Sequence, residues 1–200
     1  MKSRFFLALT LMTFIFGACS NKKDDNSGNG TLEVKTVNNI DASGLNGHYT
    51  LFSFKTGATV SISDSATAKW DIGFRSTSVI LNSGISGPGE AGVVVKDALF
   101  DAVTTADTTG YAEDSSTGFA IPTGSGNGWY TYTGENPTNP HVILPIPGKV
   151  FVVRTADKKY AKFEILSYYK NAPANPTQTE TPRYFKINYV YQSNGSTTIY

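Results

Sequence analysis

Residues 160–169 and 184–191 alternate apolar and polar side chains at every second position, and this pattern decides the fold class. In the first segment Phe163 and Ile165 alternate with Lys162. Successive side chains of a strand point to opposite faces, so this spacing predicts strands with one buried face. After residue 30 no window shows helical spacing of apolar residues over three turns, and the chain has 19 Gly and nine Pro. We predict an all-β fold of antiparallel strands.

Shorter apolar runs between turn residues predict the other strands of this fold. Two pairs have the spacing of hairpins: residues 49–54 with 58–62, and residues 150–154 with 160–169. Residues 101–128 are mostly Thr, Asp, Ser and Gly and predict a long surface loop, where function often lies. Residues 171–182 contain three prolines and also predict a loop. The remaining expected strands cover residues 31–37, 70–75, 78–81, 93–95, 141–144 and 197–200.

The first 18 residues have the layout of a secretory signal peptide. Lys2 and Arg4 precede an apolar run over residues 5–16, which is about a dozen residues and too short to span a bilayer. Gly17 and Ala18 then lead into Cys19, the only cysteine, and this segment resembles a bacterial lipobox. The resemblance implies cleavage before Cys19 and its acylation as a membrane anchor. The alternative is an ordinary signal peptide with an incidental cysteine.

Residues 20–30 contain no apolar side chain and predict a flexible tether after the anchor. Within it, Lys23, Asp24 and Asp25 resemble the acidic export signal of surface lipoproteins in Bacteroidetes-type bacteria. That resemblance implies an outer-membrane lipoprotein on the cell surface, and the alternative is a solvated linker inside the periplasm. We expect three parts in the chain: a signal peptide over 1–18, the acylated tether over 19–30, and one β domain over 31–200.

The balance of charges argues against a nucleic-acid-binding protein. The chain has 17 basic and 16 acidic residues, which gives a formal net charge of +1. Loss of Lys2 and Arg4 with the signal peptide leaves a formal charge of −1. A nearly neutral chain lacks the basic surface that nucleic-acid binding requires.

The sequence offers few residues for catalysis, so we expect no enzyme. His48 and His141 are the only histidines, and no G-x-S-x-G motif is present. With Cys19 used for lipid, a cysteine zinc site and a Cys–His dyad are excluded. Residues 87–92 match G-x-G-x-x-G, but a strand pattern follows where the dinucleotide motif needs a helix. We interpret them as a tight loop between strands.

Several segments of the chain, taken together, match the pattern of one known family. They are Trp70-Asp71-Ile72 with Phe74-Arg75, Leu81-Asn82-Ser83-Gly84 leading to Gly92, Val152-Val153-Arg154-Thr155-Ala156-Asp157, Tyr160-Ala161-Lys162 and Ser167-Tyr168-Tyr169. These segments resemble the HmuY family. The resemblance spans residues 31–200 and implies a single all-β domain. It also implies a hemophore-like lipoprotein that carries haem b between two axial ligands and passes it to a TonB-dependent outer-membrane receptor.

The positions of the family's axial ligands carry other residues here. One position falls at Thr133 or Gly134, and the other falls in the loop 101–128, which has no His or Met. His141, Tyr130 and Tyr132 therefore remain as candidate iron ligands, with His141 first.

Trp129 lies next to these candidates in the sequence and is a further candidate ligand-binding residue. Aromatic residues on strands also form sheet cores, so core packing is the competing interpretation of these rings. The alternative function is a non-catalytic surface module on the same scaffold. Such a module would have lost haem ligation and would bind another ligand, a glycan or a protein.

Overall fold

The computed structural model describes residues 32–200. The predictions of a signal peptide, of acylation at Cys19 and of a tether fall outside this range. Within it, no helix is long and apolar enough to cross a membrane.

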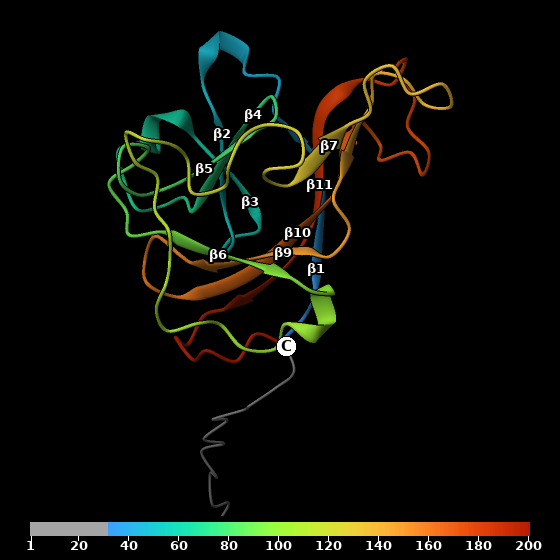
Figure 1. Ribbon diagram of the computed structural model, residues 1–200. Coiled ribbons are helices and arrows are strands. Elements are labelled where there is room, and N and C mark those ends of the chain that lie inside the picture. Colours follow the sequence, from blue (N-terminus) through green and yellow to red (C-terminus); the bar gives the residue numbers. More distant parts are fainter. Residues whose placement is uncertain (1–31) are drawn as a thin grey trace, which may run out of the picture. The chain divides into compact units, whose positions relative to one another are not determined.

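The described chain consists of β-strands and short 3₁₀ helices, which confirms the predicted all-β class (Figure 1). The strands are β1 (Lys35–Asp41), β2 (Thr50–Ser53), β3 (Ala58–Val60), β4 (Ile72–Arg75), β5 (Ser78–Leu81), β6 (Gly92–Asp97), β7 (Tyr130–Tyr132), β8 (Ile143–Pro145), β9 (Lys149–Arg154), β10 (Tyr160–Tyr169) and β11 (Pro182–Gln192). The 3₁₀ helices are η1 (Leu45–Gly47), η2 (Ile62–Asp64) and η3 (Phe100–Ala102).

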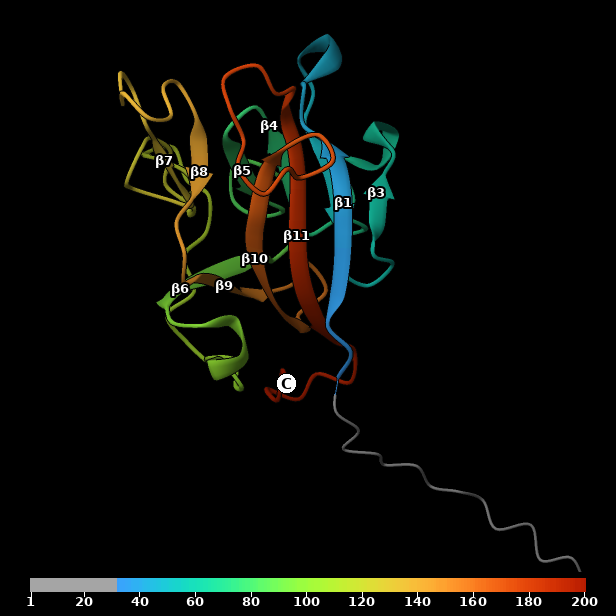
Figure 2. The same cartoon turned by 90° about the vertical axis from the view of Figure 1, so that its right-hand side faces the viewer.

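The strands form three antiparallel sheets. The largest has the order β1-β11-β10-β9-β6, the second has the order β3-β2-β4-β5, and β7 pairs with β8 in a separate two-stranded ribbon. Both predicted hairpins are present, as β2–β3 and β9–β10. Figure 2 shows the ribbon beside β10, at the end of the molecule far from the C-terminus.

Some predicted strand limits were wrong. The first strand begins at Lys35 and runs to Asp41, and the last one begins at Pro182. The expected strand over 197–200 is only a bridge from Thr198 to Thr105. The end of the chain instead fills a smaller core in which Ile199 packs with Val190.

The main core lies between the two larger sheets and consists mostly of aromatic rings. Phe54 packs on Phe163 with ring centroids 5.6 Å apart, and Phe74 packs on Phe185 at 4.7 Å. In each pair one ring comes from the four-stranded sheet or its end and the other from the five-stranded sheet. Aromatic pairs at these distances add to the free energy gained from burial. The alternating apolar residues of β10 and β11 therefore face this core.

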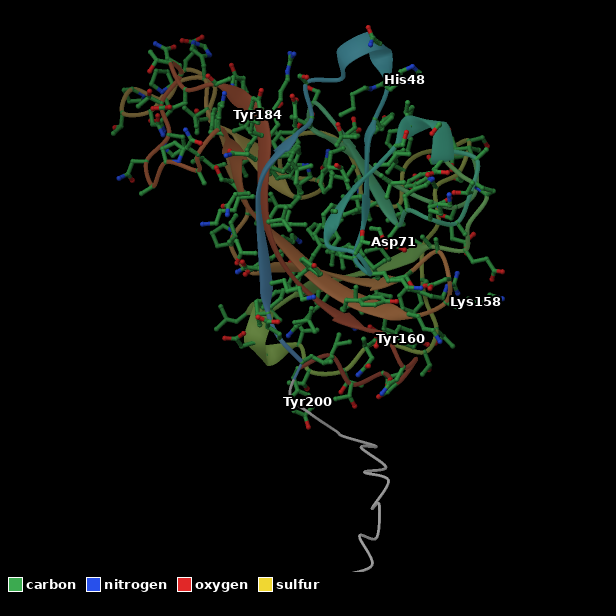
Figure 3. All side chains as sticks on the ribbon, turned by 180° about the vertical axis from the view of Figure 1, so that it is seen from behind. His48, Asp71, Lys158, Tyr160, Tyr184 and Tyr200 are labelled. Carbon is green, nitrogen blue, oxygen red and sulfur yellow. The ribbon has the colours of Figure 1, made fainter. Side chains whose placement is uncertain are left out.

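A buried carboxylate ties the two sheets together. One oxygen of Asp71 accepts the backbone N–H of Phe54 at 2.8 Å, and the other accepts that of Ala156 at 3.0 Å. Phe54 follows β2, whereas Ala156 lies in the β9–β10 turn. Asp71 is 5% exposed, and burial raises its pKa to about 6, although the two N–H donors act in the opposite direction. Figure 3 shows Asp71 in the interior of the domain.

The glycine-rich loop 87–92 is a packed connection between β5 and β6, as predicted. Asn82 is fully buried, donates to the carbonyls of Thr67 and Trp70, and accepts the N–H of Gly89. A Cβ atom on Gly87 would lie 2.2 Å from Oδ1 of Asn82. The close approach of the Asn82 side chain therefore requires glycine at position 87. Strand β6 follows the loop, whereas a dinucleotide-binding site would need a helix there.

Candidate functional site

The ribbon β7–β8 carries the residues that the sequence singled out for ligand binding. In its register Tyr132 lies opposite Ile143. Side chains directly opposite in an antiparallel pair share one face, so Tyr132 and Ile143 lie on the same side of the ribbon. Residues 133–142 connect the two strands and carry His141 next to β8.

Trp129 and Tyr130 lie in the core. Trp129 is 1% exposed, its indole N–H donates to the carbonyl of Thr77 at 2.8 Å, and its ring packs against Tyr130, Tyr168 and Phe185. Tyr130 is 8% exposed. Both rings therefore pack in the core of the sheet, which was the alternative to ligand binding. They lie apart from the exposed side chains of the ribbon.

Tyr132 and His141 are brought together at the surface. The phenol oxygen of Tyr132 lies 2.6 Å from Nδ1 of His141, and Tyr132 is 48% exposed. The other ring nitrogen of His141, Nε2, lies 3.4 Å from a carboxylate oxygen of Glu135, which is itself largely exposed. One nitrogen of the imidazole is thus in contact with a phenol, while the other faces the exposed carboxylate of Glu135.

Two adjoining cavities lie beside β8, one of them next to His141, whereas Tyr132 lines neither. The smaller, of about 280 Å³, is lined by His141, Tyr168, Tyr169 and Arg183 among others. The larger, of about 470 Å³, lies between β8, β10 and the proline-rich loop, and most of its wall is apolar. Ile143, Tyr168 and Tyr169 line both cavities, so the two spaces are neighbours.

The proline-rich loop 171–182 forms part of this site, which the sequence did not indicate. We expected function in the loop 101–128, but that segment lines neither cavity. Pro173 and Pro176 border the larger cavity, and Gln178 and Glu180 border the smaller one. The three prolines of the segment predicted only that it is a loop, and no residue pattern placed it beside His141.

The two cavity tyrosines are hydrogen-bond donors at neutral pH. Burial raises the pKa of Tyr168 and of Tyr169, so both phenols keep their protons. The oxygen of Tyr169 accepts the backbone N–H of Ile143 at 2.8 Å, which leaves its own proton for another acceptor.

Other features of the described residues do not extend this site. A cavity of about 700 Å³ beside β3 is lined by Lys55, Asp71 and Asp157 and shares no residue with the two cavities at the ribbon. His48 is exposed directly after η1 (Figure 3). Between residues 32 and 200, no three His, Cys, Asp or Glu side chains form a group that could hold a metal ion.

Comparisons with solved structures find matches at low sequence identity and with TM-scores below 0.5. A protein from Bacteroides vulgatus ATCC 8482 described as HmuY-like and heme-binding has 18% identity and a TM-score of 0.48, over 79% of this chain and 91% of its own. The Apo HmuY analog of Tannerella forsythia has 15% identity and a TM-score of 0.47, over 80% and 95%. A protein from Bacteroides fragilis NCTC 9343 described as a lipoprotein has 15% identity and a TM-score of 0.48, over 79% and 89%.

A comparison with protein-family models shows the family of this chain. No curated protein matches the chain. The model of the HmuY protein family matches residues 46–189, which includes most of both large sheets and the whole ribbon. The chain therefore belongs to the HmuY family.

Proposed function

We propose that this protein is a haem-binding carrier of the hemophore type, with His141 as the iron ligand. The observation that carries the proposal is the contact between the Tyr132 phenol and Nδ1 of His141 on an exposed ribbon, next to a small cavity that adjoins a larger and mostly apolar one. Histidine that binds a metal is commonly oriented by a hydrogen bond at its other nitrogen. Tyr132 occupies that position here.

The chemistry of the pair favours ligation through Nε2 of His141. In the tautomer that carries a proton on Nδ1, the ring donates to the Tyr132 oxygen and leaves a lone pair on Nε2. Glu135 lies 3.4 Å from Nε2, and its 90% exposed side chain is free to turn into solvent. A neutral imidazole at this nitrogen is a common axial ligand for haem iron.

The cavities beside the pair suit the porphyrin ring. The larger cavity of about 470 Å³ has aliphatic and proline side chains on its walls, which favour burial of an apolar ring. Ile143, opposite Tyr132 in the ribbon, borders this cavity and the smaller one next to His141. The space beside His141 therefore adjoins the larger apolar space, where part of a bound ring could be buried.

Tyr132→Phe tests the orienting role of the phenol. We expect about 10-fold weaker hemin binding with an unchanged position of the Soret band, because His141 remains the ligand but its ring is no longer fixed. The measurement is a spectrophotometric hemin titration of residues 20–200, which contain every strand described above. Tyr200→Phe is a matched control, since Tyr200 is also exposed and lies across the molecule from the ribbon (Figures 1 and 3). Loss of the Soret shift in Tyr132→Phe would instead make the phenol the ligand.

The same proposal places the carrier on a lipid anchor at the cell surface, from which it passes haem to a TonB-dependent outer-membrane receptor. The support is the sequence of residues 1–30 together with family membership. The β domain has no reaction of its own in this proposal. Its only task is to hold the ligand outside the cytoplasm.

Cys19→Ser tests the anchor. Wild-type cells should incorporate labelled palmitate into the protein and retain it in the membrane fraction, because acyl chains of this length hold a protein on a bilayer. The Cys19→Ser chain should incorporate no label, whereas the neighbouring control Ser20→Ala should behave as wild type. Equal labelling of the Cys19→Ser chain would contradict the lipoprotein assignment.

A further inference from the structure

The smaller cavity beside His141 has the composition of a carboxylate-binding site. Its polar wall includes the guanidinium of Arg183 and the hydroxyl groups of Ser76, Tyr168 and Tyr169. Arg183 and Ser76 both face the phenol of Tyr168. Glu180, the amide oxygen of Gln178 and the His141 imidazole can accept hydrogen bonds here, whereas Arg183 and the hydroxyl groups can donate them, and such donors match carboxylate oxygens.

The charge of Arg183 is left available by the surrounding chain. From residue 32 to the C-terminus, no Asp or Glu forms an ion pair with it, although Glu180 lines the same cavity. The other arginines outside the first 31 residues are engaged: Arg154 pairs with Glu113, and Arg75 donates to the Gly47 carbonyl. Arg183 makes a side-chain hydrogen bond to the Tyr168 phenol but has no carboxylate or backbone carbonyl partner among the described residues, so other donors of its planar fork remain for an external anion.

The backbone around the cavity is held in an unfavourable conformation. Ser76, His141 and Arg183 have φ values of 51°, 56° and 70°, although none of them is glycine. Such left-handed residues cost free energy and persist where the surrounding fold holds them, often at functional sites. Three of them on one small cavity indicate that the fold fixes the directions of these side chains.

Tyr169 adds a fixed donor to this wall. Its oxygen is held by the N–H of Ile143 at 2.8 Å, and its proton remains for an acceptor in the cavity. The tyrosine stays protonated because burial raises its pKa. A bound carboxylate could therefore receive a neutral donor from Tyr169 and a charged fork from Arg183.

We propose that this cavity binds a carboxylate group of the porphyrin, with Arg183 as the main partner and Tyr169 as a second donor. The identity of the ligand rests on the proposed function. Haem b carries two propionate side chains at one edge of its ring. His141 lines the same cavity as Arg183, so a propionate of a ring held at His141 could reach the guanidinium.

The test uses a porphyrin without iron, so that it does not depend on ligation by His141. Residues 20–200 are titrated with protoporphyrin IX and with its dimethyl ester, and binding is followed by quenching of tryptophan fluorescence. We expect wild type to prefer the free acid about 10-fold, and Arg183→Gln to lose that preference while binding the ester unchanged. Lys35→Gln, at an exposed lysine on β1, removes the same charge elsewhere and should keep the preference.

Three outcomes would overturn the proposal. The first is equal binding of the free acid and the ester by wild type. The second is an equal loss of the preference for the free acid in Arg183→Gln and in Lys35→Gln. The third is displacement of the porphyrin by free propionate at equal concentration. The last would identify a small acid as the ligand. A retained preference for the acid in a protein that gives no shifted Soret band with hemin would support this carboxylate site and contradict only the proposed iron ligation.

Discussion

Replacing Asp71 with alanine is expected to lower the free energy of unfolding by about 3 kcal/mol at pH 5. The change leaves the backbone N–H groups of Phe54 and Ala156 without their acceptor in a site that is 5% exposed. Each buried unpaired N–H costs about 1–3 kcal/mol. The two groups belong to different sheets, so the loss also loosens the contact between them.

Urea unfolding followed by circular dichroism measures this effect. The matched control is Asp97→Ala, because Asp97 is an exposed carboxylate paired with Lys149 at the surface. Removing an exposed pair of this kind should cost less than about 1 kcal/mol. If the two alanine variants unfold at the same urea concentration, Asp71 does not join the sheets in the way described.

Asp71 also predicts a pH dependence of stability. Its folded-state pKa of about 6 lies above the ordinary value of 3.8, so between these pH values the folded chain binds a proton that the unfolded chain has released. Stability therefore falls as the pH rises from about 4 to about 6, by roughly 3 kcal/mol, and then levels off. The side-chain amide in the Asp71→Asn variant does not titrate in this pH range. The wild-type advantage over this variant should shrink by that amount between pH 4 and pH 7.

His141→Ala is expected to abolish the shifted Soret band and to weaken hemin binding about 100-fold. Nε2 of this residue is the nitrogen assigned to iron, and the described residues hold only one other histidine. That residue, His48, is exposed and lines neither cavity at the ribbon, so His48→Ala is the control and should bind hemin as wild type does. Equal spectra for the two alanine variants would contradict the assignment of His141.

The strands that form the core were predictable because their patterns reflect burial on one face. Residues 160–169 alternate in sequence, and Ala161, Phe163 and Ile165 are indeed buried in β10. The alternation did not predict the burial of Lys162. This lysine was expected on the polar face, but it is 2% exposed and donates to the carbonyls of Phe100 and Val103. The chain that accepts these hydrogen bonds is η3 and the residue after it, a segment with no strand pattern in the sequence.

The candidate site was predicted only in part. The strand β7 has three residues, too few for alternation to separate the buried Tyr130 from the exposed Tyr132. The meeting of Tyr132 with His141 depends on the ribbon register and on the left-handed backbone at His141, and neither can be read from residue types. The position of Arg183 at the cavity could not be predicted from residue types either, because it depends on an irregular backbone at the start of β11.

A hemin titration of the wild-type domain, residues 20–200, decides whether this protein binds haem. We expect a sharp, red-shifted Soret band that saturates at one hemin per chain, because the iron would be held by a protein ligand beside an apolar cavity. A broad, unshifted band that grows without saturation would contradict haem binding. That result would favour a surface module of the same family that carries another ligand.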